Sequence, residues 1–235
     1  MSCRVRSTSG ADHEDGSALV VVLLGMTLLL ALTEAALLLA SSDTLAASRH
    51  RDARIALSVA EAALERAASE LVEAPDWSLV LSGAVTSSRV DGPASTSRVP
   101  FGERTLTPDQ AANLATCGTT GACSAAACAS VTAERPWGAN NPRWRPYAYG
   151  WFDPTAPGQA AAYVVVLVGD DPSENDGDPG RDGVAPGNPG AGIVLLRAEV
   201  IGPSDTRRVV EAAVTRVTVA SGAALPRFLS WSELR

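Results

Sequence analysis

Carboxylates are the side chains of this sequence whose spacing most suggests chemistry. They are concentrated in residues 169–191, where they alternate with glycine, proline and asparagine. Flexible, carboxylate-rich loops are typical ligands of hard cations such as Ca²⁺, which takes roughly six to eight oxygens. The sequence therefore suggests a Ca²⁺ site, and the candidate ligands are Asp170, Asp171, Asp176, Asp178 and Asp182.

This acidic segment departs from the best-known calcium-binding pattern. Asp178, Asp182 and Gly183 match the first, fifth and sixth positions of an EF-hand loop. However, Gly180 stands where the third ligand belongs, and no glutamate occupies the twelfth position. A solvated acidic loop is thus the alternative to a Ca²⁺ site, and no other cofactor is indicated.

Three cysteines form the second group with chemical potential. Cys117, Cys123 and Cys128 are close together in a segment rich in alanine, threonine, serine and glycine. Such a group can form one disulfide and leave one thiol over, and the spacing does not indicate which two would pair. Free thiols are the second alternative. Zinc is the third, although no histidine or second cysteine pair lies nearby to complete four ligands.

Several classes of function are disfavoured by what the sequence lacks. Its only histidines are His13 and His50, which lie near the N-terminus and not in the later part of the chain where a catalytic site would form. We find no phosphate-binding glycine loop and no G-x-S-x-G motif, so we do not expect an enzyme. The net charge of −7 argues against a nucleic-acid partner, which would require a basic surface.

The element that comes first along the chain is an apolar helix. Residues 18–40 are apolar or small except for Thr27, Thr33 and Glu34. At about 1.5 Å per residue this run extends roughly 35 Å, which is enough to cross a hydrocarbon core of about 30 Å. It is longer than the apolar core of a cleaved signal peptide, so we predict a transmembrane segment.

An amphipathic pattern continues this helix over residues 41–74. One face recurs at helical steps and is apolar except for Asp52, and most charged residues take the other face. The residues of the apolar face are Leu45, Asp52, Ile55, Val59, Ala63, Ala67 and Leu71. Pro75 ends the pattern. We therefore predict one long helix over residues 17–74, with a membrane part and a part that packs on a globular head.

Residues 75–235 are predicted to form that head. Residues 75–158 contain recurrent proline, glycine, serine and threonine, so we expect an irregular region with short strands near 78–85 and 147–152. Apolar or alternating runs at 160–168, 192–200 and 207–219 predict an antiparallel meander over residues 160–220. The aromatic tail after residue 225 either packs back on this sheet or contacts a partner. The fold class is thus α+β: a long N-terminal helix followed by an antiparallel sheet.

Two stretches of this sequence resemble a known family. Gly16-Ser17 followed by ALVVVLLGMTLLLAL is similar to the processing site and N-terminal segment of type IV prepilins. The downstream AASRHRDARIALSVAEAALERAASEL resembles the helix of PilX-type minor pilins. The resemblance covers residues 16–71 with good specificity and implies a pilin-like fold.

The resemblance also implies a processing route and partners. Residues 1–16 would be a leader that prepilin peptidase removes after Gly16, and Ser17 would then be open to N-methylation. The mature subunit would cross the inner membrane once with its head in the periplasm, and would join an extracellular pilus through contacts with other pilins and the assembly platform. The leader differs from the family pattern, because Asp12, Glu14 and Asp15 stand where basic residues are usual.

Two residues of the apolar helix bear on assembly. Major pilins carry glutamate at the fifth mature position, where this sequence has Val21, and in the family that carboxylate pairs with the N-terminal amine of a neighbouring subunit. A subunit at the fibre tip has no such neighbour ahead of it, and an unpaired carboxylate in hydrocarbon is costly, so valine favours a tip position. Glu34 lies near the outer end of the span, where it either extends its carboxylate to the interface or pairs with the Ser17 amine.

Two further hypotheses remain beside a minor pilin that helps to initiate or cap a type IV pilus. The first is a K-type minor pseudopilin of a type II secretion system, which also lacks the glutamate. The second, from another class, is a signal-anchored envelope module that binds Ca²⁺ or another ligand through the acidic segment.

Overall fold

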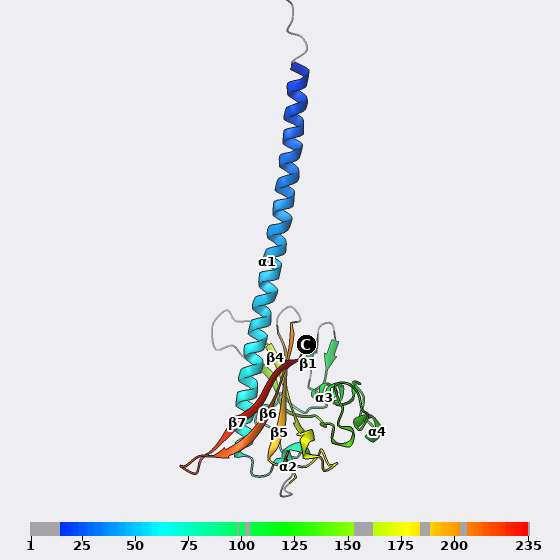
Figure 1. The fold of residues 1–235 in the computed structure, drawn as a ribbon, viewed down its shortest axis with the longest axis vertical. Helices are drawn as coiled ribbons and strands as arrows, with labels where there is room; N and C mark the ends of the chain where they lie inside the picture. The colour runs from blue at the N-terminus through cyan, green and yellow to red at the C-terminus, as the bar shows by residue number, and fades with distance from the viewer. Residues whose placement is uncertain are drawn as a thin grey trace, which may run out of the picture. The chain divides into compact units, whose positions relative to one another are not determined.

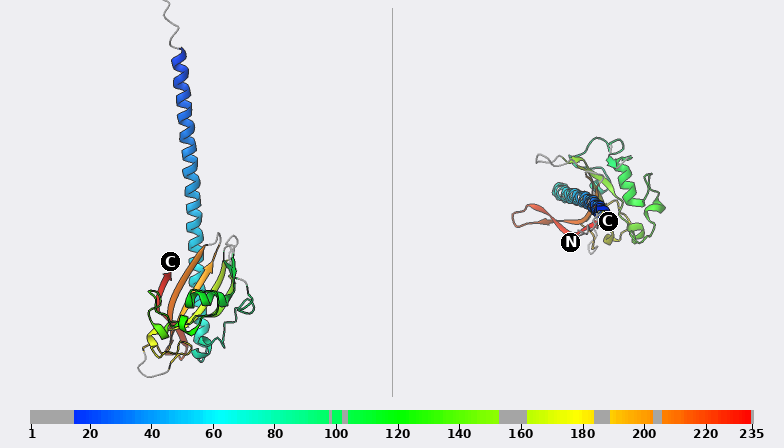
Figure 2. Two further views of the ribbon diagram at one scale, coloured as in Figure 1. Left: turned by 90° about the vertical axis from the view of Figure 1, so that its right-hand side faces the viewer. Right: turned by 90° about the horizontal axis from the view of Figure 1, so that it is seen from above.

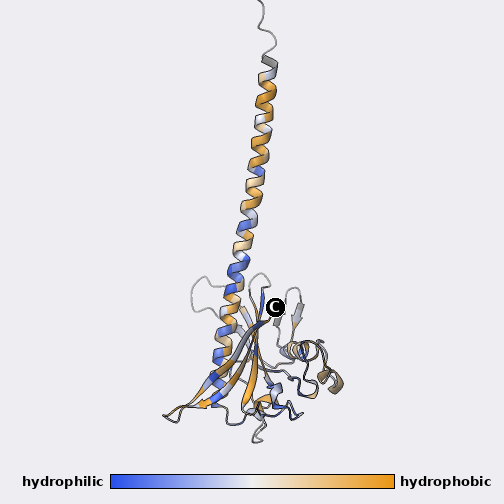
Figure 3. Cartoon of the chain, viewed as in Figure 1, coloured by the Kyte–Doolittle hydropathy of each residue, from blue (hydrophilic) through white to orange (hydrophobic). Residues whose placement is uncertain are grey.

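The computed structural model describes residues 15–97, 99–101, 104–152, 162–183, 189–202 and 206–234. The chain divides into two compact units, Met1–Ser48 and Arg49–Arg235. Helix α1 (Asp15–Glu73) is uninterrupted over 59 residues and so contributes to both units (Figure 1). The expectation of one long helix is therefore confirmed. Figure 3 shows apolar colouring along its N-terminal part and mixed colouring along its C-terminal part.

The second unit is built on a five-stranded antiparallel sheet. Its strands follow one another in chain order, so each connection joins direct neighbours. The strands are β3 (Arg145–Phe152), β4 (Ala162–Asp170), β5 (Ile193–Ile201), β6 (Arg207–Thr218) and β7 (Ala224–Leu234). The predicted meander is present, and it is longer than residues 160–220 because β3 and β7 extend it at both edges.

The C-terminal half of α1 packs on one face of this sheet. Ala56, Ala60, Ala63 and Ala67 form a buried stripe of small side chains, with Leu64 and Leu71 beside them. Small side chains let the helix backbone approach the strands closely. The strand residues in the same core are Val164, Val166, Val168, Val194, Leu196, Ala198, Val200, Val210, Ala212 and Val214.

Helix α3 (Pro108–Cys117) packs on the opposite face of β3 and β4 (Figure 2). Thr107 caps its N-terminus in a reciprocal capping box with Gln110, and Gly118 ends it in the left-handed region at φ 75°. Its Ala111 contributes to a second core with strand residues such as Tyr163. β4 is therefore buried on both faces, which explains its nearly continuous apolar sequence.

Residues 75–158 are more regular than the sequence predicts. Besides α3 and β3 they contain α2 (Trp77–Leu81), α4 (Ala125–Cys128), the turn η1 (Gly138–Asn140) and a hairpin of β1 (Val99–Phe101) with β2 (Arg104–Leu106). The strand predicted at 78–85 is wrong. The Asp76 side chain accepts a hydrogen bond from the Ser78 N–H and so starts a helix there instead.

These elements make an α+β protein in which an N-terminal helix packs against an antiparallel sheet. The architecture is pilin-like, as the sequence indicates.

Candidate functional site

The N-terminal part of α1 exposes apolar side chains on all sides. From Leu19 to Leu45 every large apolar residue is exposed, and Val21 is 67% accessible. The most apolar window has a mean hydropathy of 2.3, and none of it is buried. By length and composition this helix can cross a membrane, which suggests membrane anchoring or a secretion signal. Glu34 is also exposed.

Four hydroxyl groups in this part of the helix donate to backbone carbonyls of the same helix. Thr27 donates to the Leu24 carbonyl, and Thr33 donates to the carbonyls of Leu29 and Leu30. Ser41 and Thr44 bond in the same way to carbonyls three or four residues earlier. Because an unpaired polar group in hydrocarbon is costly, these bonds suit an apolar surrounding.

The junction between Gly16 and Ser17 lies at the beginning of α1, one residue after its start at Asp15. Residues 1–14 of the predicted leader, with Asp12 and Glu14, lie outside the described residues.

The acidic segment places two carboxyl groups in the interior of the head. Asp170 is the last residue of β4, and Glu174 ends the 3-10 turn η2 (Pro172–Glu174). Each is only 3% exposed. Asp171 starts η2 by accepting a hydrogen bond from the Ser173 N–H, and this turn brings Glu174 back toward Asp170. The sequence pattern does not single out Glu174 as a ligand, and only the turn signal of Asp171-Pro172 points to this placement.

Two glycines hold the Glu174 side chain and backbone in place. A Cβ atom added at Gly183 would lie 1.6 Å from Glu174 Oε1, and one added at Gly190 would lie 2.4 Å from the Glu174 nitrogen. Any side chain at either position would displace Glu174 or the backbone around it. The glycines of this segment therefore allow the chain to close tightly around a carboxylate.

Neither buried acid forms an ion pair with a basic group in the described part of the chain. Within the described residues, Asp170 Oδ1 and both Glu174 carboxylate oxygens are buried and accept no hydrogen bond of ordinary geometry. Burial raises the pKa of Asp170, and the neighbouring Glu174 raises it further. Burial likewise raises the pKa of Glu174, with a contribution from Asp176. The two carboxyl groups form a coupled pair with a strong demand for positive charge or a proton.

The other predicted ligands have local roles. Asp176 is exposed and accepts a hydrogen bond from the Asp178 N–H, and Asp178 is also exposed. Asp182 accepts a hydrogen bond from the Gly192 N–H at 2.7 Å, which ties the loop to the start of β5. Within the described part of the chain, no three histidine, cysteine or acidic side chains converge as a metal-binding group. The five aspartates predicted as ligands are therefore not gathered at one point.

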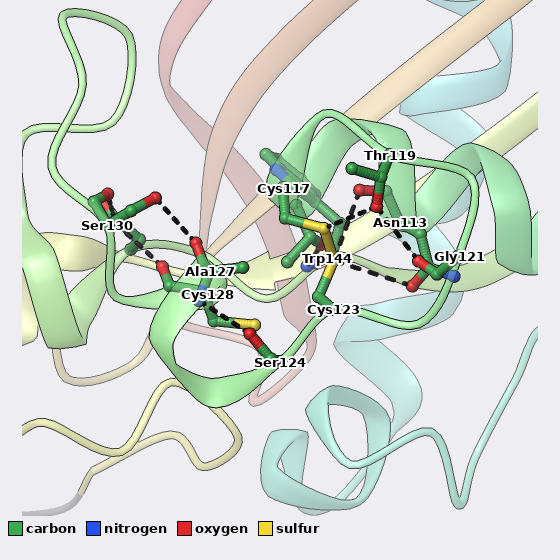
Figure 4. The surroundings of a disulfide bond; sticks show 12 residues. Asn113, Cys117, Thr119, Gly121, Cys123, Ser124, Ala127, Cys128, Ser130 and Trp144 are labelled. Atoms are coloured by element: carbon green, nitrogen blue, oxygen red, sulfur yellow. Dashed lines mark hydrogen bonds between the residues drawn. A yellow bond between two sulfur atoms is a disulfide. The ribbon is translucent and has the colours of Figure 1, made fainter.

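The cysteine cluster contains one disulfide, between Cys117 and Cys123, whose Cα atoms are 6.0 Å apart (Figure 4). It joins the end of α3 to the segment before α4. Cys128 lies on α4 as a buried free thiol. The disulfide thus closes a short loop directly after α3. Thr116, near the end of the same helix, accepts a hydrogen bond from the Trp144 backbone N–H.

A groove of ≈ 330 Å³ lies between α1 and the edge strand β3. Its charged wall is formed by Arg66 and Glu70. The Arg66 guanidinium carbon lies 5.5 Å from the centroid of the Phe152 ring, and Glu70 Oε1 lies 4.0 Å from Arg89 Nε. The segment that contains Ser87 and Arg89 forms backbone hydrogen bonds with β3, so part of this edge strand is already paired.

The opposite edge of the sheet is formed by β7, which pairs only with β6 among the described strands. Leu225, Leu229, Trp231 and Leu234 are all more than a third exposed on it. An edge strand with exposed apolar side chains is suited to contact with another protein.

Comparisons of this chain with protein-family models, with curated proteins and with solved structures found no match.

Proposed function

We propose that this protein is a minor pilin that helps to initiate or cap a type IV pilus. The observation that carries the proposal is the N-terminal part of α1, whose apolar side chains from Leu19 to Leu45 are all exposed. Such a surface requires lipid or other apolar helices around it. A pilin uses both environments in turn, first the bilayer and then the helix-packed interior of a fibre.

The same helix supports a location. The subunit is held in the inner membrane by residues 18–40, with its head in the periplasm, until the assembly platform inserts it into an extracellular fibre. The internally bonded hydroxyls of Thr27 and Thr33 suit this route, because they leave neither threonine hydroxyl unpaired in the span.

Val21 supports a place at the fibre tip. Its side chain is apolar and exposed, so it offers no carboxylate for the amine of a subunit ahead. Glu34 provides the only carboxylate within residues 18–40 and lies on the outer half of the span.

The head supplies surfaces for specific contacts with other pilins. The outward face of the α1 segment in the second unit carries exposed Arg51, Arg54, Glu65 and Arg66, so its contacts are polar. The apolar edge of β7 provides a contact of a different kind. Both suit a subunit that recognises particular neighbours, and no catalysis is required of it.

Processing at the junction of Gly16 and Ser17 tests the proposal. The full chain is co-expressed with a prepilin peptidase, and the protein extracted from membranes is analysed by intact mass spectrometry. We expect a product that begins at Ser17 and carries one added methyl group. Gly16→Leu should block cleavage. Gly25→Ala is the matched control, because a Cβ atom at Gly25 has no neighbour within 4 Å.

A wild-type protein that still begins at Met1 under these conditions would overturn the proposal. It would favour the envelope module with a signal anchor instead. A K-type pseudopilin would be processed in the same way and is distinguished by the fibre that it enters.

A further inference from the structure

The end of strand β4 carries a pair of buried acids that no part of the pilin proposal uses. Asp170 and Glu174 are each only 3% exposed, and three of their four carboxylate oxygens accept no hydrogen bond of ordinary geometry from the residues that the structure describes. Burying two carboxylates without a compensating charge is costly, so the pair requires either a positive partner or a shared proton.

That partner is not an arginine within the described residues. The ion pairs found there engage Arg89, Arg197, Arg207 and Arg208, each with a glutamate elsewhere in the head. Asp176 adds negative charge from the same loop. A Cβ atom added at Gly183 would lie 3.3 Å from Asp176 Oδ2 and would also meet the Glu174 carboxylate, so both acids lie against Gly183. The chain contains no lysine that could reach the pair.

We propose that Asp170 and Glu174 are the two carboxylate ligands of a Ca²⁺ ion that fastens η2 and residues 176–183 to the end of the β-sheet. A divalent cation balances the two negative charges of the pair. The remaining oxygens come from backbone carbonyls of the surrounding turns and from water, both of which are common Ca²⁺ ligands. Gly183 and Gly190 let the backbone approach Glu174 closely, as such a site needs.

Ca²⁺ fits this site better than Mg²⁺. The two acids lie on an irregular turn, and Ca²⁺ accepts irregular geometry with roughly six to eight oxygens, whereas Mg²⁺ requires a nearly ideal octahedron. The site keeps only Asp170 of the five aspartates predicted as ligands and adds Glu174. It does not depend on the chain being a pilin.

The test uses the full chain in detergent, with CaCl₂ as the probe and MgCl₂ as the comparison. Titration calorimetry should give one site per chain, and 10 mM Ca²⁺ should raise the melting temperature above its value in EGTA. With a dissociation constant of about 1 mM, as in extracellular calcium modules, the rise should be about 3–6 °C. Mg²⁺ at the same concentration should give at most a small part of it.

Two substitutions assign the ligands. Glu174→Gln and Asp170→Asn should each weaken Ca²⁺ binding by about tenfold or more, since each removes one of the two charged ligands. In EGTA both should melt no lower than the wild type, because each removes a buried, uncompensated charge. Asp178→Asn is the matched control: this residue is on the same loop but exposed, and it should bind Ca²⁺ as the wild type does.

Three results would overturn the proposal. The first is no heat and no change of melting temperature with Ca²⁺. The second is equal loss of binding in Asp178→Asn, which would indicate a diffuse acidic surface. The third is a melting temperature that does not change with Ca²⁺ but rises as the pH falls from 8 to 6 in the wild type and not in Asp170→Asn. That pattern would mean that the pair shares a proton instead. If one of the two ligand variants does not fold, the other gives the same readings.

Discussion

At the scale of single residues, all three tyrosines of the chain report on the interior of the head. Burial raises the pKa of Tyr147 to about 12, and the nearby Glu70 and Glu73 add to the rise. Burial also raises the pKa of Tyr163 to about 12, with Asp91 as the next cause. Tyr149 is shifted in the same direction, chiefly by burial. The folded protein thus holds every phenolic proton more tightly than an unfolded chain does.

We expect this difference to appear in a spectrophotometric titration. In the native protein the tyrosinate absorbance at 295 nm should not rise with a midpoint near pH 10, whereas the chain in urea should titrate near that value. Because the folded state keeps protons that the unfolded state releases, the free energy of unfolding should fall as the pH rises from 10 towards 12, and should not respond to these groups below that window. A native titration with one tyrosine ionising near pH 10 would show that its ring is not buried as described.

Val21 is the residue on which the tip position depends. In Val21→Glu the subunit gains the carboxylate of a fibre-body pilin. Immunogold labelling of fibres from the native host should then shift from their tips to positions along the shaft. The matched control is Val22→Glu, which places the same charge one residue away. It should lower the amount of assembled subunit without moving it along the fibre, since an unpaired carboxylate in the span is costly. Unchanged labelling in Val21→Glu would contradict the tip assignment.

At the scale of elements, the contact of α1 with the sheet depends on small side chains. Ala60 is fully buried at the centre of the alanine stripe. Ala60→Leu should lower the free energy of unfolding by about 1–3 kcal/mol, because a larger side chain overfills the close helix–sheet contact. Urea unfolding of the full chain in detergent measures this change.

Ser58→Leu is the control on the same helix. It introduces the same side chain at an exposed position and should change the stability by no more than about 0.5 kcal/mol. Equal stability of the two variants would contradict packing of this helix segment on the sheet.

The elements were predictable from sequence where the pattern was long. The helical repeat of residues 41–74 identified Ala63, Ala67 and Leu71 as inward residues, and they are buried. It placed Leu45, Ile55 and Val59 on the same stripe, but Leu45 is exposed. Ile55 and Val59 are only half-buried, because Ala56 and Ala60 take the centre of the contact. The sequence period gives the face of a helix, while the orientation on the sheet is set by which small residues allow the closest approach.

Short segments were harder to assign. WSLVL is equally consistent with a strand and a helix, and the Asp76 cap decides for the helix of Trp77–Leu81. The tail was expected to pack on the sheet or contact a partner, and it forms the edge strand β7. Pro226 and a bulge next to Ser230 interrupt the alternation of this strand, so the sequence pattern does not indicate a strand here.

The candidate site was only partly predictable for a similar reason. The sequence shows that residues 169–191 are acidic, but not which acids are inside. Burial of Asp170 follows from its place at the end of a strand that is buried on both faces, and burial of Glu174 follows from the turn started by Asp171. Both depend on contacts made after the sheet has formed.

At the scale of the whole molecule, the two units have different requirements. The first presents apolar surface around a helix and needs a surrounding that the described chain does not supply. The second contains its own cores on both faces of the sheet, a disulfide and a buried acid pair. A place in a helix-packed fibre would meet both requirements, because neighbouring helices would surround the first unit while the second keeps its own cores.

Mass spectrometry of fibres sheared from the native host tests this account most directly. We predict that the purified fibres contain this chain in the form that begins at Ser17, at far less than one copy per major subunit, as expected for a tip subunit. Fibres of a type II secretion system that contain it in place of pili would assign it to the pseudopilins. Its absence from all sheared fibres, with the full-length chain from Met1 retained in the membrane, would contradict the account.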